Sequence, residues 1–536
     1  MGLFENFPYT NFHELNLAWL LEEMKKLVEA MKNYDVHMEQ LVDEWLQAHP
    51  EYVTTVVDGS LTLPKFAESL KLVTVKDYVT PEMYGAVGDG VTDDTAAVQS
   101  AISSGADTVL LLGTYLITAQ LAAAGSQKII GVPGATLLWD EVNGENSLIT
   151  GSGLSDITYQ NITFDFGSQT ELMHSISLMT CSNIKFEGCT IKNSYGYALR
   201  LNQSSGILIK DCAFVDITGA AGNPGGAIYG QDMKDLTVSG CSCENLGDHF
   251  VYSAGVTAAE NILITGCIIK TTGANGLTSG SAICLYANTK NVTVSDCIFE
   301  DCREGVYAGY YSTYPDSPEN ITITNCIFKN TTVNAMTLWG VSASAPVKHI
   351  SIDNCEILTA GQDGICIRHG SFMQLSNITI NNVTRYSLEA SDTYGSIFSG
   401  FNITDVINTG TIVTNGSYGT STYNIFRDFF IKPSASALGT AMGFYHRDGN
   451  YNMLTNIRAY DFPTNIYKAG ALNTWLESNA AAANKSFFFT TDITELIYHN
   501  VGDVVFNAAP TVGSPAFWVC TVAGAPGTMK VGSTVS

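Results

Sequence analysis

Ser182–Ile191 has the sequence SNIKFEGCTI, and this pattern of a small polar residue, alternating apolar residues and a central Cys recurs along the chain. Two further copies are KNVTVSDCIF at Lys290–Phe299 and ENITITNCIF at Glu319–Phe328. Periods of twenty to fifty residues are typical of solenoids and propellers. Each unit holds short alternating strands and Gly, Asn or Ser turns, with no helical stretch. We therefore predict a mostly β protein, a β-solenoid of the parallel β-helix kind.

The central cysteines mark the period of the repeat. They are Cys189, Cys212, Cys241, Cys267, Cys297, Cys326 and Cys355, separated by 23, 29, 26, 30, 29 and 29 residues. Successive coils of such a fold stack at about 4.8 Å, so one position forms a column of identical neighbours. A small apolar thiol fills a core column well. The alternatives are metal ligation and disulfides, but one Cys per coil provides neither a CxxC pair nor a His at ligand spacing.

Composition excludes several classes of protein. The 536 residues include 26 Lys+Arg and 51 Asp+Glu, a net charge of 26 − 51 = −25, and only 14% are charged. Such an acidic surface repels phosphate backbones and anionic lipid, so we expect no nucleic-acid partner. No run of about 18 apolar residues is present, so we expect no membrane insertion. Met1–Phe12 lacks the basic and apolar regions of a signal peptide, which argues against ordinary secretion and an extracellular disulfide framework.

The N-terminal region has a different pattern. Between Leu17 and Ala48, apolar residues recur every seven positions, at Leu17, Met24, Met31, Met38 and Trp45 and at Leu20, Leu27, Tyr34 and Leu41. Four such heptads predict an α-helical coiled coil, the alternative being one amphipathic helix packed on its own domain. The predicted domains are a helical anchor (1–50), a linker (51–80), the capped β-helix (81–435), its end or a β-rich extension (436–497), and a small β module (498–536).

Met83–Ile102 has the sequence MYGAVGDGVTDDTAAVQSAI. This resembles, almost residue for residue, the opening motif of pectate-lyase-like proteins. The resemblance implies a right-handed parallel β-helix whose N-terminal cap begins here, with Asp93 and Asp94 before a short helix. Asp94 before Thr95 also suits a helix N-cap. A catalytic or calcium site at Asp89, Asp93 and Asp94 is the alternative, and we favour a structural cap.

The N-terminal run FENFPYTNFHELNLAWLLEEMKKL, which starts at Phe4, resembles the anchoring segment of preneck appendages and tail spikes of short-tailed phages. That resemblance implies a homotrimer located in the virion, held to phage tail or connector proteins through this segment. It also implies a host cell-surface polysaccharide or teichoic acid as the partner. Gly502–Ser536 resembles the short β-structured endings of phage fibres. Its Phe517, Trp518 and Cys520 suit sugar binding, a trimerisation plug or a packing core equally well.

Candidate catalytic residues come from aligning the second strand of each coil on its inward apolar residue. The aligned residues are Leu199, Ile228, Phe250, Ile283, Val306, Met336 and Ile365. Two positions earlier, one outer column then carries Asp248, Glu304 and Asp363, two coils apart at about 9.6 Å. Inverting glycosidases separate their two carboxylates by about 6.5–9.5 Å. The alternative is that these are solvated turn residues.

Other polar and aromatic residues gather around this column. His249, Arg368 and His369 are predicted to orient or stabilise groups at the site. Tyr286, Tyr307, Tyr310 and Trp339 offer aromatic faces for sugar rings, with Tyr311 and Tyr314 beside them. No metal-binding or cofactor motif is present, so we predict neither a metal nor a cofactor.

Two functions fit these features. The first is a phage appendage that binds a host glycan and hydrolyses it, with Asp248, Glu304 or Asp363 as acid and base. The second is a non-enzymatic adhesin that holds sugars through aromatic residues. A free polysaccharide lyase is less well supported, because it requires an export route and more basic residues near its site.

Overall fold

The computed structural model divides into two units, residues 1–76 and 77–536. It describes residues 78–140, 147–167, 173–219, 225–272, 280–310, 316–414, 421–435, 441–446, 452–459, 462, 464–468, 475–477, 489–490, 504–507, 515–522 and 528–534. The predicted coiled coil and nearly all of the predicted linker lie outside these residues. Within them, no helix is long and apolar enough to cross a membrane.

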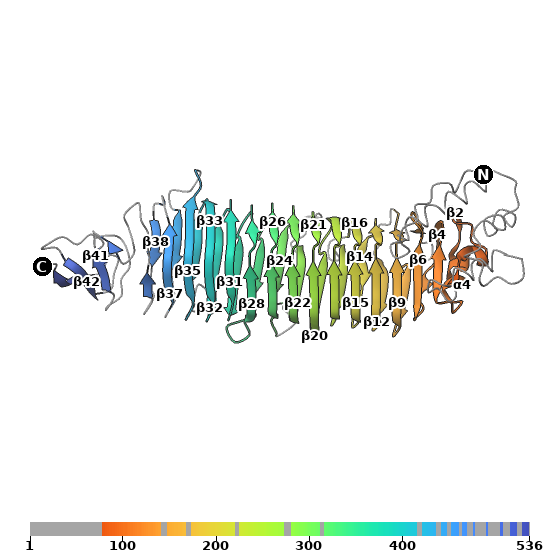
Figure 1. Ribbon diagram of the computed structural model, residues 1–536, viewed down its shortest axis with the longest axis horizontal. Coiled ribbons are helices and arrows are strands. Elements are labelled where there is room, and N and C mark those ends of the chain that lie inside the picture. The colour runs from red at the N-terminus through yellow and green to blue at the C-terminus, as the bar shows by residue number, and fades with distance from the viewer. Residues whose placement is uncertain are drawn as a thin grey trace, which may run out of the picture. The chain divides into compact units, whose positions relative to one another are not determined.

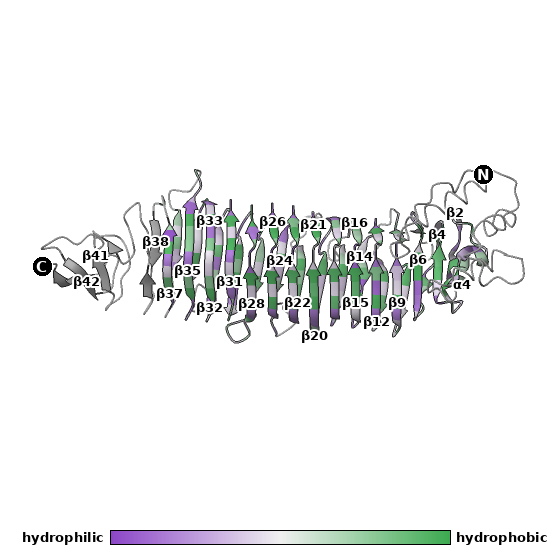
Figure 2. Ribbon diagram, viewed as in Figure 1, coloured by the Kyte–Doolittle hydropathy of each residue, from purple (hydrophilic) through white to green (hydrophobic). Residues whose placement is uncertain are grey.

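The second unit is a parallel β-helix, as predicted (Figure 1). Each coil contributes three strands, and each strand pairs in parallel with the equivalent strand of the next coil. This produces three strand ladders, which connect at the corners into one 39-stranded sheet. Alternating apolar side chains of all three ladders fill the interior as a single hydrophobic core, and Figure 2 shows hydrophobic residues along the strands of successive coils.

Ladder I carries the strand before each central Cys. It includes β9 (Ser155–Gln160), β12 (Ser182–Glu187), β15 (Ser205–Lys210), β18 (Lys234–Ser239), the second halves of β20 (Val251–Thr265) and β22 (Ser281–Ser295), β25 (Glu319–Thr324) and β28 (Val347–Asp353). Ladder II follows the Cys. It includes β13 (Thr190–Lys192), β16 (Ala213–Ile217), β19 (Ser242–Leu246), β21 (Ile268–Lys270), β23 (Ile298–Glu300) and β26 (Ile327–Lys329).

Ladder III positions the candidate site. It includes β14 (Gly196–Arg200), β17 (Gly226–Gln231), the first halves of β20 and β22, β24 (Glu304–Gly309), β27 (Met336–Trp339), β30 (Ile365–Ser371) and β32 (Tyr386–Tyr394). The ladders continue through β36 (Met442–His446), β37 (Met453–Ala459), β38 (Thr464–Lys468) and β39 (Trp475–Glu477). A separate sheet holds β40 (Phe489–Thr490), β41 (Val504–Asn507), β42 (Pro515–Val522) and β43 (Thr528–Thr534). Its last three strands lie within residues 498–536, where a small β module was predicted, and β40 lies before them.

The cap motif forms the short helices η3 (Pro81–Tyr84) and α4 (Thr95–Ile102). Its carboxylates bind the cap itself. Asp94 accepts hydrogen bonds from the backbone N–H groups of Val87 and Gly88, at 2.7 and 3.0 Å. Asp94 is the N-cap residue of α4, as predicted, but its side chain makes no capping bond, and Asp93 instead accepts from the N–H and hydroxyl of Thr95, at 3.0 and 2.6 Å. These bonds assign the motif a structural role.

The seven central cysteines stack in the core, as predicted. Each is at most 2% exposed, and each thiol donates to the carbonyl two residues earlier, at 3.2–3.6 Å. All twelve cysteines whose burial is described are free thiols. The stack is therefore a packing column.

Burial of these thiols leads to a labelling prediction. In a Cys520→Ser variant, which retains only the twelve described cysteines, we expect less than about one thiol per chain to react with Ellman's reagent in the native state. All twelve should react in guanidinium chloride, because only an exposed thiolate is an effective nucleophile. Rapid reaction of several thiols in the native protein would contradict the stack.

The turns between ladder III and ladder I form a second column, here called the turn column. Register places at one level Asp156, Asn183, Gly206, Asp235, Asn261, Asn291 and Asn320. All seven have φ between 53° and 64°, the left-handed region that Asn, Asp and Gly tolerate. Side-chain amides link the coils, for example Asn291 Nδ2 to Asn261 Oδ1 at 3.1 Å and Asn320 Nδ2 to Asn291 Oδ1 at 3.2 Å.

Candidate functional site

The outer side of ladder III carries the predicted catalytic residues, but its register differs from the sequence alignment. Val251, and not Phe250, lies level with Ile228 and Ile283. His249 therefore shares the column with Ser281 and Glu304, and Asp248 lies one residue outside it. Asp363 lies in the same column two coils beyond Glu304, because Val306 is level with Met336 and Met336 with Ile365.

The three carboxylates are buried, which rules out the alternative that they are solvated turn residues. Asp248 is 2% exposed, Glu304 7% and Asp363 0%. A buried carboxylate is costly unless hydrogen bonds or a counter-charge compensate it. Each of the three carboxylates has different partners, and these partners decide which carboxylate is suited to transfer a proton.

Asp248 pairs with the neighbouring His249. Its Oδ2 lies 3.1 Å from His249 Nε2, and His249 Nδ1 lies 2.6 Å from the backbone oxygen of Ser281. The other carboxylate oxygen, Oδ1, is buried and has no hydrogen-bond partner within the described part of the chain. Burial raises the pKa of Asp248, while His249 and Arg303 oppose the shift. One oxygen of this buried carboxylate is thus left without a donor, which is the kind of group that a bound water satisfies.

Glu304 accepts hydrogen bonds from hydroxyl groups, and Arg303 and His249 stabilise its charge to a smaller extent. Ser281 Oγ donates to Glu304 Oε2 at 2.8 Å, and Thr337 Oγ1 donates to Oε1. Asn334 Nδ2 in turn donates to the Thr337 hydroxyl at 2.9 Å. Burial raises the pKa of Glu304 in spite of these bonds. A carboxyl group with a raised pKa and no bound cation is suited to donate a proton.

Asp363 is bound by an arginine from the next coil. Arg385 Nε donates to Asp363 Oδ1 at 2.7 Å, Arg385 Nη2 donates to Oδ2, and the Tyr386 N–H also donates to Oδ1 at 3.2 Å. Burial raises the pKa of Asp363, and Arg385 opposes this shift. With both oxygens engaged by one guanidinium, Asp363 is less available for proton transfer than Asp248 or Glu304.

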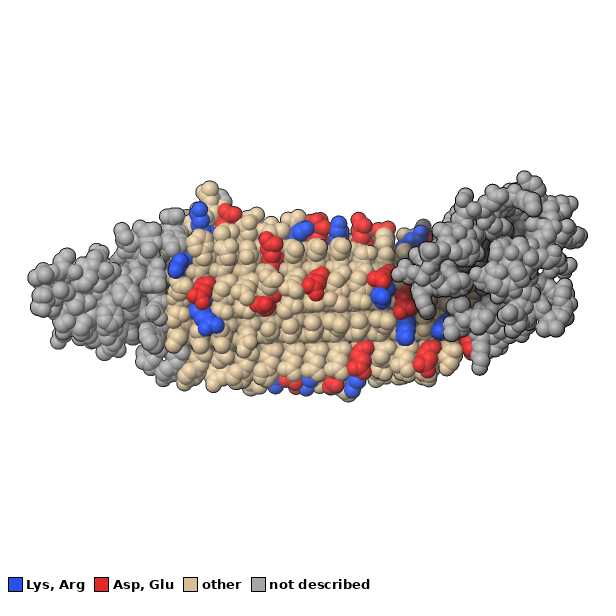
Figure 3. Space-filling view, in the orientation of Figure 1, with Lys and Arg blue, Asp and Glu red and all other residues tan. Residues whose placement is uncertain are grey.

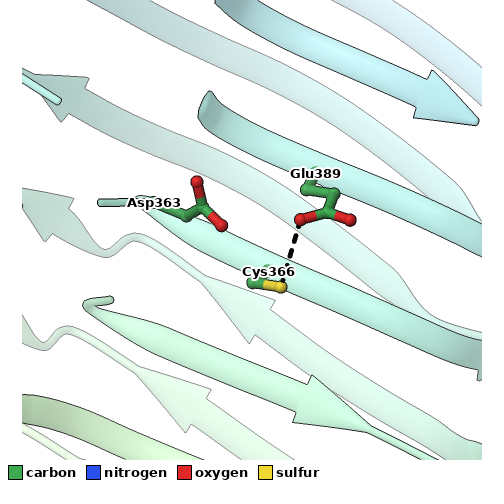
Figure 4. Close-up of side chains that lie close together, drawn as sticks. All are labelled: Asp363, Cys366 and Glu389. Carbon is green, nitrogen blue, oxygen red and sulfur yellow. Dashed lines mark hydrogen bonds between the residues drawn. The ribbon is translucent and has the colours of Figure 1, made fainter. Parts of the chain in front are cut away.

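Asp363, Cys366 and Glu389 come close enough to suggest a metal site (Figure 4). Their other partners argue against one. Cys366 Sγ donates to Glu389 Oε2 at 3.4 Å, and Arg368 Nη2 lies 3.4 Å from the same oxygen. Arg385 Nη2 lies 3.7 Å from it as well. Two guanidinium groups already supply the positive charge that a cation would bring.

The other predicted polar residues separate into two groups. Arg368 joins the site, with its guanidinium carbon 4.8 Å from the ring centroid of Trp339. His369 has φ of 54° and binds Asp392 through Nδ1, so the structure places it beside the turn and not beside Asp363. Arg385 and Glu389 were missed by sequence reasoning, because only strand register shows that they contact the coil before them.

A row of tyrosines runs along the outer side of ladder III beside the carboxylates. Its members, called here the tyrosine row, are Tyr197, Tyr229, Tyr252, Tyr286 and Tyr307. Ring centroids of neighbours lie 4.5, 4.9, 5.5 and 5.3 Å apart. The last four are partly exposed. His249 lies 5.4 Å from Tyr252, which connects the row to the Asp248 pair.

Four aromatic residues were predicted to bind sugar. Tyr286 and Tyr307 belong to the tyrosine row, while Tyr310 and Trp339 form an edge-to-face pair at 5.5 Å. Tyr311 and Tyr314 lie outside the described residues. Tyr229 and Tyr252 were missed, although correct alignment of Ile228 with Val251 would have placed them in one column.

Comparison with known proteins supports the fold and the predicted class. Residues 147–320 match the family model described as the right handed beta helix region. The chain is 29% identical over 198 residues to the K30/K69-specific capsule depolymerase of Klebsiella phage K64-1, which covers 34% of this chain and 24% of that protein. It is 25% identical over 321 residues to the pre-neck appendage protein of Bacillus phage phi29, covering 56% of this chain and 33% of that protein.

A solved structure shows the same architecture. Tailspike protein 3 of bacteriophage CBA120 has a TM-score of 0.51 at 13% identity, over 97% of this chain and 77% of that one. At this identity the likeness concerns the fold alone. The predicted relationship to phage tail spikes and preneck appendages, which are virion proteins, is confirmed by these relatives. The chain spans about a quarter to a third of the length of the two curated relatives described above.

Proposed function

We propose that this chain is a phage tail-spike or appendage protein that binds a host cell-surface polysaccharide or teichoic acid along ladder III and hydrolyses it. The observation that carries the proposal is the tyrosine row beside buried carboxylates of raised pKa. Aromatic faces bind the apolar faces of sugars, and a protonated carboxyl group beside them can protonate a glycosidic oxygen. The relatives, a capsule depolymerase and an appendage protein, support the same class of ligand.

In this proposal Glu304 is the general acid and Asp248 the general base. The two residues are two coils apart, about 9.6 Å along the axis, and Asp248 lies one residue outside the column of Glu304, so their backbones are about 10 Å apart. Inverting glycosidases hold their two carboxyl groups about 6.5–9.5 Å apart with a water between acid and base, so the two side chains must extend toward each other. His249 is a positioning residue, because it holds one oxygen of Asp248 and leaves Oδ1 for the water. Asp363 and Arg385 support β30, which carries Arg368, and the Arg368 guanidinium lies over Trp339 of β27.

The second candidate function is a glycan-binding adhesin without catalysis. It is favoured by the extent to which the carboxylates are engaged, since all three accept hydrogen bonds or pair with a neighbouring charge. Homotrimer formation and attachment through the N-terminal segment are further parts of the proposal.

An assay with purified polysaccharides separates the two functions. The full-length protein is incubated with capsular polysaccharides, wall polysaccharides and teichoic acids from a panel of bacteria, and new reducing ends, released phosphate and binding are measured. We expect one glycan to be bound and cut. Binding without products would favour the adhesin, and neither binding nor products across hosts of the phage would contradict both functions.

Substitution in the tyrosine row tests where the glycan binds. We expect Tyr252→Ala combined with Tyr286→Ala to weaken binding of that polysaccharide on the order of tenfold, which corresponds to about 1.4 kcal/mol for the two rings together. Tyr84→Ala, at a 42% exposed position of the cap, is the matched control and should bind normally. Unchanged binding by the double variant would contradict a site on ladder III.

A further inference from the structure

The turn column changes its residue type in the C-terminal coils. Register continues it from Asn320 to His349, Phe372, Gly395 and Tyr423. The backbone stays left-handed, with φ of 56°, 53°, 59° and 56°. Asn, Asp or Gly occupies this conformation in the earlier coils, whereas Phe and Tyr rarely adopt it. The later coils therefore accept backbone strain in order to place aromatic rings at this turn.

These rings form an exposed stack. Its members, called here the aromatic stack, are His349, Phe372, Tyr394 and Tyr423. Neighbouring ring centroids lie 5.7, 5.5 and 5.7 Å apart; His349 and Phe372 are parallel, and the other two pairs meet edge to face. Phe372 is 51% exposed, Tyr394 47% and Tyr423 54%, so core packing does not account for them.

Gly395 lets the rings approach one another. A Cβ at this position would lie 3.2 Å from two ring atoms of Phe372. The ring that continues the stack belongs instead to the preceding residue, Tyr394. Strain persists in a structure where function requires it, and here the strain and the exposure coincide.

The surface on one side of the stack carries no charge, and Lys348, which precedes His349 on the other side, is paired with Glu319 at 2.8 Å. The flanking residues two positions after the turn column are Ser351, Gln374, Ile397 and Ile425. On the face of the molecule seen in Figure 3, charged side chains are likewise scattered over a mostly uncharged surface. An acidic or basic protein partner would find no complementary charge at these four positions.

The size of the stack also argues against a protein partner. A buried aromatic side chain covers about 150–250 Å², so three half-exposed rings offer roughly 300 Å². A stable protein interface needs about 800 Å² from each partner. A few sugar units match the smaller area, and their apolar faces can lie against the rings.

We infer that the aromatic stack is a second glycan-binding strip, which holds an uncharged stretch of polysaccharide along the axis of the β-helix. Phe372 follows Arg368 of ladder III by four residues in the same strand-turn segment, roughly 13 Å at strand spacing. The strip therefore lies close enough to ladder III for one polysaccharide chain to contact both. The inference rests on the proposed function in that the ligand is taken to be the host glycan.

The test uses residues that the turn column itself prefers. Phe372→Asn combined with Tyr423→Asn removes two rings and relieves the strain at both positions. In the full-length protein, we expect affinity for the polysaccharide selected from the panel to fall about tenfold, with a melting temperature unchanged or raised. Tyr84→Asn, at the exposed position of the cap, serves as the matched control and should bind normally.

The outcomes separate this inference from the proposed function. Unchanged affinity, or weaker binding with a lowered melting temperature, would overturn the inference. A different particle mass of the double variant and the wild type in light scattering would also overturn it, because the aromatic stack would then join copies of the chain. If only Tyr252→Ala with Tyr286→Ala weakens binding, the proposed function stands without the strip. If the wild-type protein binds no polysaccharide of its phage's hosts, the proposed function and the inference fail together.

Discussion

Replacing Glu304 with glutamine is expected to lower the rate of polysaccharide hydrolysis at least a hundredfold while leaving polysaccharide binding intact. General acid catalysis contributes about 10²–10⁴-fold to a rate, and an amide has no proton to donate to the leaving oxygen. The glutamine carbonyl can still accept a hydrogen bond from Ser281 or Thr337. Reducing-end release and binding should be measured on the same preparation.

The pH dependence of stability provides an independent readout of the same group. Because burial raises the pKa of Glu304, the native state retains this proton where the unfolded chain has already lost it. Its contribution to the free energy of unfolding therefore falls as pH rises from the ordinary carboxyl pKa through the raised native pKa. Glu304→Gln removes this titration, so the variant should gain stability relative to the wild type across that window.

Glu319→Gln is the matched control for Glu304→Gln. Glu319 lies on ladder I, partly exposed, and Lys348 and Lys290 lower its pKa. Glu319→Gln should leave the rate of hydrolysis unchanged. Relative to the wild type, this variant should lose stability as pH rises through the carboxyl range, which is the opposite of Glu304→Gln. Normal hydrolysis by Glu304→Gln, or lost hydrolysis with a lowered melting temperature, would contradict the role of general acid.

Sequence reasoning predicted the fold from features that repeat visibly. The Cys that follows each ladder I strand marks the register of that strand, so the column through Cys297 could be aligned from the sequence. Ladder III has no such marker. Phe250 and Val251 are both apolar and both buried, and hydrophobicity alone could not decide which is level with Ile228. The one-residue error exchanged His249 for Asp248 in the predicted column.

The groups that stabilise the buried carboxylates could not be predicted, for a related reason. The sequence shows that Asp363 lies beside the apolar core, but its partner Arg385 is 22 residues away. Only the register of neighbouring coils brings the two together. The alternative of solvated turn residues fails because the three carboxylates are buried on the outer side of ladder III. The same register shows that Phe372 and Tyr423 continue the turn column, although neither resembles asparagine.

Arg385→Leu is expected to destabilise the C-terminal coils, because it leaves the fully buried Asp363 carboxylate without its counter-charge. Breaking a buried ion pair from one side costs about 3–5 kcal/mol. We expect a value near 3 kcal/mol, since the Arg385 side chain is 39% exposed and solvent already screens part of the pair. Thermal melting followed by circular dichroism should show a lower transition temperature.

A second substitution distinguishes a stranded charge from lost packing. Arg385→Leu combined with Asp363→Asn removes both charges and retains an oxygen for the Tyr386 N–H, so it should recover most of the lost stability. The loss of unfolding free energy in Arg385→Leu should also become smaller as pH falls, because burial raises the pKa of Asp363 and protonation removes its charge. Arg427→Leu, at an exposed position, should change little. If the stability lost in Arg385→Leu does not depend on pH and is not recovered in the double variant, Arg385 acts through packing. The assignment of Asp363 and Arg385 as a charge-compensated pair would then be wrong.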